Sequence, residues 1–73
     1  FMVKQFDEND WNHMHDCVLD CTWDTTKTNL NKNQLIDLFN TLPDILKNDA
    51  YEYGMNDTVW RDSFCYWYKK NKL

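Results

Sequence analysis

The sequence predicts an all-α fold: a small single-domain bundle of three main helices, the second broken or kinked at Pro43. Apolar residues recur at the helical period through most of the chain. Residues that favour helix N-termini precede each of these periodic runs. No stretch shows the alternation of a half-buried strand. A chain of 73 residues forms one domain, and we expect that domain to span residues 2–73, because Phe1 precedes the Met2 at which a natural start is expected.

The first helix is expected at about residues 8 to 23, after a cluster of acidic and amide residues that suit a helix N-terminus. At 100° per residue, one stripe of this helix is apolar. The stripe contains Trp11, Met14, Val18 and Cys21, with Cys17 at its edge. The opposite, solvated face carries three aspartates at a spacing of four residues, Asp16, Asp20 and Asp24.

The start of the second helix has the clearest local signal. Asn31 can cap the helix, and Gln34 three residues later can bond back to it, as in a capping box. Leu30 before the cap and Leu35 after it fit a hydrophobic staple. We therefore predict that this helix begins at Asn31 or Lys32.

Pro43 interrupts the second helix, because proline lacks an N–H and its ring clashes with the carbonyl four residues earlier. We predict a break or sharp kink at residues 40 to 43, with Thr41 as a new cap, Pro43 in the first turn and Asp44 at the helix N-terminus. The apolar positions keep one helical phase across the break, which indicates that both pieces face the same core. These positions are Leu35, Leu38, Phe39, Leu42, Ile45, Leu46, Ala50 and Tyr53.

The last helix is predicted at about residues 57 to 71. Gly54 suits the end of the preceding helix, and Asn56 or Asp57 can cap the last one. The predicted inner face contains Val59, Trp60, Ser63, Phe64 and Trp67. Tyr66 and Tyr68 are then expected to point to two other sides, where exposed aromatic residues favour protein binding.

Composition restricts the class of protein more than its function. A single Gly excludes glycine-rich phosphate loops, and the length excludes a Rossmann or barrel enzyme. The three cysteines are an odd number, so no closed disulfide framework is expected, which favours a reducing cytoplasm. We expect no enzyme, no cofactor and no membrane span.

A metal-binding or thiol protein remains an alternative. His13, Cys17 and Cys21 lie four residues apart on one helix, and Cys65 could complete a tetrahedral zinc site. The spacing matches no common zinc signature, and a free cysteine on an apolar stripe packs as a small hydrophobic residue. We therefore predict that Cys17 and Cys21 are buried and unliganded.

A helix-turn-helix DNA-binding regulator is a further alternative, because Ala50 and Gly54 have the expected spacing and a helix follows. The charge opposes it. The chain carries 12 acidic against 8 basic residues, a net charge of −4, and the exposed start of the last helix has Asp57 and Asp62 beside one Arg61. Such a surface repels phosphate, so no direct nucleic-acid binding is expected.

The acidic face of the first helix suggests a different role. Carboxylates about 6 Å apart along a helix lie near the spacing of successive phosphates. Asp16, Asp20 and Asp24 could therefore occupy a basic nucleic-acid groove on another protein. With Tyr66 and Tyr68, these residues are the predicted partner-binding set. Whether the acidic face or the aromatic last helix forms the interface stays open at this point, as does self-association.

The short acidic chain, rich in Asn, Asp, Lys, Tyr and Trp, resembles small bacteriophage early proteins in style. One example of this style is the stretch Tyr53-Gly54-Met55-Asn56-Asp57-Thr58-Val59-Trp60-Arg61-Asp62. The resemblance implies a host-takeover or anti-defence role in the host cytoplasm, and it assigns no functional residues. We expect a non-enzymatic protein-binding module, an inhibitor that occludes a larger host protein involved in nucleic-acid handling or defence.

Overall fold

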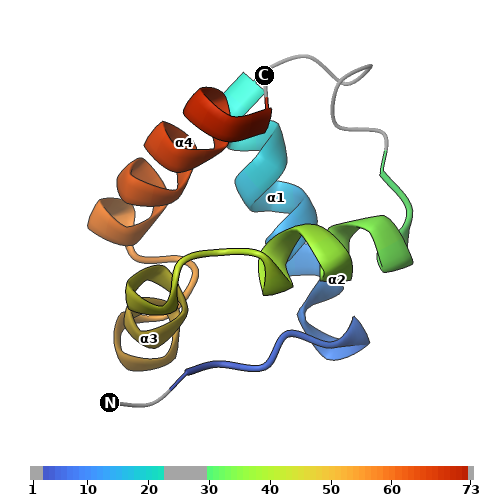
Figure 1. The fold of residues 1–73 in the computed structure, drawn as a ribbon, viewed down its shortest axis with the longest axis horizontal. Coiled ribbons are helices and arrows are strands. Elements are labelled where there is room, and N and C mark those ends of the chain that lie inside the picture. Colours follow the sequence, from blue (N-terminus) through green and yellow to red (C-terminus); the bar gives the residue numbers. More distant parts are fainter. Residues whose placement is uncertain (1–2, 23–29, 73) are drawn as a thin grey trace.

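The computed structural model of the chain describes residues 3–22 and 30–72. Within these ranges there is no strand, which confirms the all-α prediction. The number of helices differs from the prediction, because the break at Pro43 separates two helices completely. The elements are the 3-10 turn η1 (Glu8–Asp10) and the helices α1 (Trp11–Thr22), α2 (Lys32–Asn40), α3 (Asp44–Tyr53) and α4 (Thr58–Lys72) (Figure 1).

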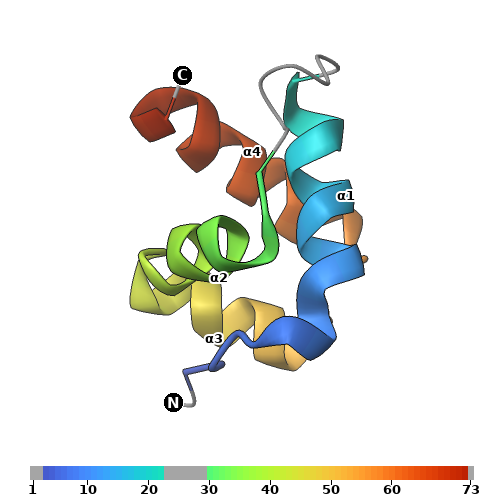
Figure 2. The same cartoon turned by 90° about the vertical axis from the view of Figure 1, so that its right-hand side faces the viewer.

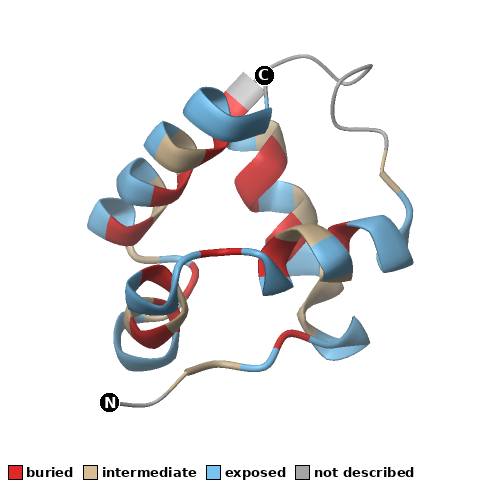
Figure 3. Ribbon diagram, in the orientation of Figure 1, coloured by how far each residue is buried: buried red, intermediate tan, exposed pale blue. Residues whose placement is uncertain are grey.

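The helices surround one core. α1 packs against both α2 and α4, and α3 packs against α4 (Figures 1 and 2). The buried side of each helix faces the centre of the molecule, while the outer sides are exposed (Figure 3). None of the described helices combines the length and the apolar character that crossing a bilayer requires.

The segment before α1 is held by a capping box and by contacts with α2. Asp7 is the N-cap of η1 and forms a reciprocal capping box with Asp10. Phe6 is buried, and its ring meets the edge of the Phe39 ring at a centroid distance of 5.3 Å. The Phe6 N–H also donates to Oδ1 of Asn40 at 3.3 Å. These contacts attach the N-terminal segment to the end of α2.

The predicted capping box at the start of α2 is confirmed. The Gln34 N–H donates to Oδ1 of Asn31 at 2.8 Å, and the Asn31 N–H donates to Oε1 of Gln34 at 2.9 Å. Leu35 is buried and Leu30 packs against the core, as a staple requires.

The break before α3 lies where it was predicted, but its details differ. Thr41 does not cap α3: it is the C-cap of α2, and its hydroxyl donates to the Leu38 carbonyl at 2.6 Å. Pro43 takes the N-cap position with ψ 148°, which is extended, and Asp44 starts the helix. Leu46 and Ala50 are buried in the same core as α2, so the prediction that both pieces face one core is confirmed, but the buried arc of α3 is narrower than predicted. Ile45 and Tyr53, predicted to be inside, are 65% and 64% exposed.

The turn between α3 and α4 follows the predicted signals. Gly54 ends α3 with φ 88°, and its N–H donates to the Ala50 carbonyl. Asp57 caps α4, since its Oδ2 accepts from the Trp60 N–H at 2.9 Å. The two predicted caps that depend on Gly54 and Asp57 are therefore confirmed.

The inner face of α4 is rotated relative to the prediction. Trp60 and Phe64 are buried as expected, but Val59 and Ser63 are exposed and Trp67 is half-buried. Tyr68 takes the inner position instead. The rotation follows from α1, which packs against the side of α4 that carries Cys65. The Phe64 ring has four aromatic neighbours, at centroid distances of 4.9 Å for Phe39, 5.5 Å for Trp60, 5.8 Å for Tyr68 and 6.3 Å for Trp67.

Candidate protein-binding surface

The acidic face of α1 is exposed at two of its three predicted positions. Asp16 and Asp20 point to solvent, and Asp24 lies outside the described residues. Asp20 is not a free charge, because it forms an ion pair with Arg61 of α4. The carboxylate of Asp20 is therefore partly neutralised, and Asp16 is the better candidate for attracting a basic partner.

Arg61 is occupied by contacts within the protein. Its Nε donates to the Met55 carbonyl at 2.8 Å, one terminal nitrogen donates to Oδ1 of Asn56 at 3.0 Å, and the other pairs with Asp20. The helix-turn-helix alternative needs this guanidinium at the start of α4. The α3–turn–α4 arrangement is present, but its one early cation is turned toward the turn and α1. This placement weighs against DNA contact by α4.

The two predicted tyrosines have opposite environments. Tyr66 is 71% exposed and lies on the outer side of α4. Tyr68 is only 4% exposed, its ring packs on Phe64, and burial raises the pKa of its phenol. The prediction that Tyr68 projects away from the core is wrong, because α4 is rotated toward α1. Tyr68 is a core residue, and Tyr66 alone remains a candidate anchor.

A groove lies beside Tyr66, between α3 and α4. It has a volume of about 540 Å³. Its apolar lining includes the exposed Ile45 of α3 and Tyr66 and Trp67 of α4. Its charged lining residues are both acids, Asp49 of α3 and Asp62 of α4. The remaining lining residues are Pro43, Leu46 and Ser63. The groove thus combines apolar side chains with two carboxylates.

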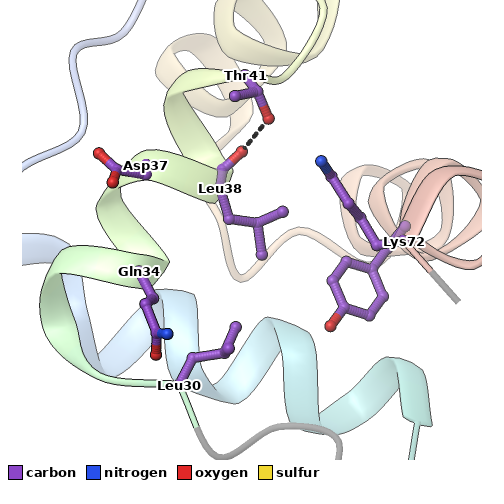
Figure 4. Close-up of a pocket in the computed structure, with 7 residues that line it drawn as sticks. Leu30, Gln34, Asp37, Leu38, Thr41 and Lys72 are labelled. Atoms are coloured by element: carbon purple, nitrogen blue, oxygen red, sulfur yellow. Dashed lines mark hydrogen bonds between the residues drawn. The ribbon is translucent and has the colours of Figure 1, made fainter.

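A second hollow, of about 710 Å³, lies between α2 and the end of α4. Figure 4 shows Leu38 and Lys72 extending into it from two helices, with Leu30 and Gln34 at one side and the Asp37 carboxylate pointing away from it. Tyr68 also lines it. Its charged groups, Asp37 and Lys72, have opposite signs, so the hollow shows no preference for a charged partner.

The cysteines differ from the prediction in one respect. Cys17 and Cys21 are both buried, as predicted. Cys21 is not free, however: it forms a disulfide with Cys65, with the two Cα atoms 5.1 Å apart. The expectation of no disulfide from the odd cysteine count is wrong, because α1 and α4 bring two cysteines together and leave the third aside. The bond also removes the ground on which the cysteine count favoured a reducing cytoplasm. The bond joins α1 to α4 through two cysteines that are 44 residues apart in sequence.

Cys17 is the free cysteine of the described chain, and its environment suppresses its reactivity. Its side chain is fully buried, and its Sγ donates to the Met55 carbonyl at 3.7 Å. Burial raises the pKa of this thiol to about 12, an effect that the nearby Arg61 only partly opposes. A nucleophilic cysteine requires the thiolate, so this site is the opposite of what catalysis needs.

The residues of the zinc alternative do not form a cluster. His13 is exposed on α1, whereas Cys17 is buried and Cys21 and Cys65 are consumed by the disulfide. Within residues 3–22 and 30–72, no three histidine, cysteine or acidic side chains are grouped so that they could hold a metal ion.

The groove is the feature that sequence reasoning missed. Ile45 is expected in the core because the apolar phase continues through Pro43, Asp62 is considered only as a charge that opposes DNA binding, and Asp49 is not considered. The signal that bears on Ile45 is Pro43 itself, since a break there changes the direction of the chain and therefore which side of α3 faces inward. No protein-family model, curated protein or solved structure matches this chain.

Proposed function

We propose that this protein is a non-enzymatic binding module that attaches to a larger, basic protein and blocks its surface by occupying it. One observation carries the proposal: large apolar side chains and the carboxylates of Asp49 and Asp62 share one outer face, at the α3–α4 groove. Exposed aromatic residues provide binding energy at protein interfaces, while charge complementarity directs the encounter.

The acidic surface indicates the class of partner. Asp16 on α1 and Asp62 on α4 are both exposed, and the Asp20–Arg61 pair lies in the region where these two helices pack together. A partner attracted to this surface carries a positive patch of the kind that proteins use for nucleic acid. The proposed activity is therefore stoichiometric inhibition of a protein that handles nucleic acid or acts in defence, in keeping with the resemblance to phage early proteins.

The chemistry of Cys17 and of the α3–α4 groove supports binding over catalysis at these two places. The buried thiol of Cys17 is held neutral, and the groove is lined by two aspartates, a serine and apolar groups without a histidine or cysteine beside them. General acid–base or nucleophilic catalysis needs such groups in hydrogen-bonding contact.

The test is a capture experiment with nucleic acid as competitor. Tagged protein is incubated with a bacterial lysate, and the retained proteins are identified with and without added double-stranded DNA. We expect a basic protein to be retained at a fixed stoichiometry and to be displaced by DNA. Retention that DNA does not affect would exclude occlusion of a nucleic-acid site.

The kinetic test uses the captured protein and the Asp16→Lys variant. Asp16 is preferred to Asp20, because reversing Asp20 would also break its contact with Arg61. We expect slower association at low salt and a smaller effect at higher salt, since charges are screened over about 8 Å at 0.15 M. Asp37→Lys, which reverses an exposed charge on α2, is the matched control. Equal association rates for Asp16→Lys and the unaltered protein would contradict steering by this face.

A further inference from the structure

The side chains along the α3–α4 groove are spaced so that a third helix could pack between them. Each wall consists of side chains one helical turn apart, Ile45 and Asp49 on α3 and Asp62 and Tyr66 on α4. Ridges formed by residues four apart are the surfaces into which another helix packs. An extended strand would instead need an exposed sheet edge, and the described residues contain no strand.

The charge of the groove selects the kind of helix. Among its lining residues the charged groups are Asp49 and Asp62, and none is a cation. Beyond the lining, Lys70 lies with its ammonium 5.9 Å from the centre of the Tyr66 ring. The lining of the groove is therefore negative at Asp49 and Asp62, and Lys70 lies one turn past Tyr66 on α4. A docked helix with lysine or arginine at one end would lie with that end over the two aspartates.

We infer that the groove binds a basic amphipathic helix of the partner protein, with its apolar side chains on Ile45, Tyr66 and Trp67 and its cationic end at Asp49 and Asp62. This inference rests on the proposed function and narrows it, because it assigns the contacting segment of the partner. The charge complementarity argues against a second copy as the occupant, since the chain has a net charge of −4.

The experiment uses two synthetic helical peptides of about 16 residues with the same leucine face. One peptide carries lysines at one end, and the other carries glutamates at the same positions. Binding is measured by titration of the ¹⁵N-labelled protein, following backbone amide shifts. We expect the lysine peptide to shift the amides of residues 45–49 and 62–67, and the glutamate peptide to leave them in place.

Matched variants identify the groove. Tyr66→Ala is compared with Tyr51→Ala, since both tyrosines are exposed on helices and only Tyr66 lines the groove. The double change Asp49→Asn and Asp62→Asn is compared with Asp37→Asn. We expect Tyr66→Ala to weaken binding of the lysine peptide about tenfold or more, a typical effect for an interface anchor. The double amide variant should weaken it several-fold at low salt, and the controls should stay within about twofold.

Three results would overturn the inference: equal binding of the two peptides, equal losses in Tyr51→Ala and Tyr66→Ala, or a dimer in sedimentation that Tyr66→Ala dissociates. These results are separable from failure of the proposed function. If the peptide does not use the groove but DNA still displaces the captured protein and Asp16→Lys still slows its association, only the helix-docking inference is wrong. If DNA and Asp16→Lys have no effect either, the proposed function is also wrong.

Discussion

Removing the Cys21–Cys65 disulfide is expected to cost a large part of the folding stability. The bond closes a loop over a sequence separation of 44 residues. In the chain-entropy model, a cross-link of this length removes about 13 cal/mol/K from the unfolded chain, or about 4 kcal/mol at 25 °C. Domains of this size lie near the lower end of the usual range of about 5–15 kcal/mol. Reduction should therefore leave the protein only marginally folded.

The assay is urea unfolding followed by tryptophan fluorescence, with and without a reductant such as a phosphine. The double variant Cys21→Ala/Cys65→Ala should have the same urea midpoint as the reduced protein, and the reductant should not change that midpoint. Cys17→Ala is the control: it keeps the disulfide, so it should stay sensitive to reductant. If protein with a verified disulfide lost less than about 1 kcal/mol on reduction, the loop-closure reasoning would be refuted. Three titratable thiols in unreduced, denatured protein would show that the bond does not form.

Three further predictions concern the turn and the buried thiol. Burial raises the pKa of Cys17 from 9.0 to about 12, so stability that is complete below pH 9 should fall as the pH rises toward 12. Burial also raises the pKa of the Tyr68 phenol from 10.0, so Tyr68 adds to this fall above pH 10. Cys17→Ala should therefore reduce the pH dependence in unfolding curves and leave the part that Tyr68 contributes, and an unchanged dependence would contradict the role of Cys17. Gly54→Ala should lower the stability of the protein by about 1–3 kcal/mol, because alanine rarely adopts a φ of 88°. Nothing lies within 4 Å of an added Cβ, so the whole loss would come from backbone strain. A stability equal to that of the unaltered protein would contradict this. Arg61→Gln should lower the free energy of unfolding in urea by about 1–3 kcal/mol, because Arg61 also donates a hydrogen bond to the Met55 carbonyl. Asp20→Asn removes only the ion pair and should lower it by less than about 1 kcal/mol. Equal losses in the two variants would show that the ion pair dominates.

Local signals in the sequence predicted local structure well. Helix caps depend on hydrogen bonds and backbone angles among residues that are close in sequence, so residue types at fixed spacings predict them. This holds for the capping box of Asn31 and Gln34, the Asp57 cap and the end of α3 at Gly54. The break at Pro43 belongs to the same class. Its consequence for Ile45 was missed, because the change of direction at Pro43 determines which side of α3 faces inward.

Features that depend on helix-to-helix placement could not be predicted. Helical periodicity gives an apolar arc on α4 but not which edge of that arc faces a neighbour, and α1 packs on the edge that buries Tyr68 and exposes Val59. The same packing brings Cys65 to Cys21. For the candidate surface, the sequence identified Tyr66 and Asp16 correctly as exposed residues, but the groove forms only when α3 and α4 lie together.

The disulfide also constrains the order in which the chain can fold. α3 and α4 are joined by a connection of four residues, so their contact is local and closes at little entropic cost. The pairing of α1 with α4 must close a much longer loop, and the two sulfurs meet only when it has formed. The Cys21–Cys65 disulfide is therefore expected to form late in folding, when the rest of the chain is nearly native. Alkylation of free thiols at successive times during refolding would check this order, and capture of the Cys21–Cys65 bond before α4 acquires helical signal would reverse it.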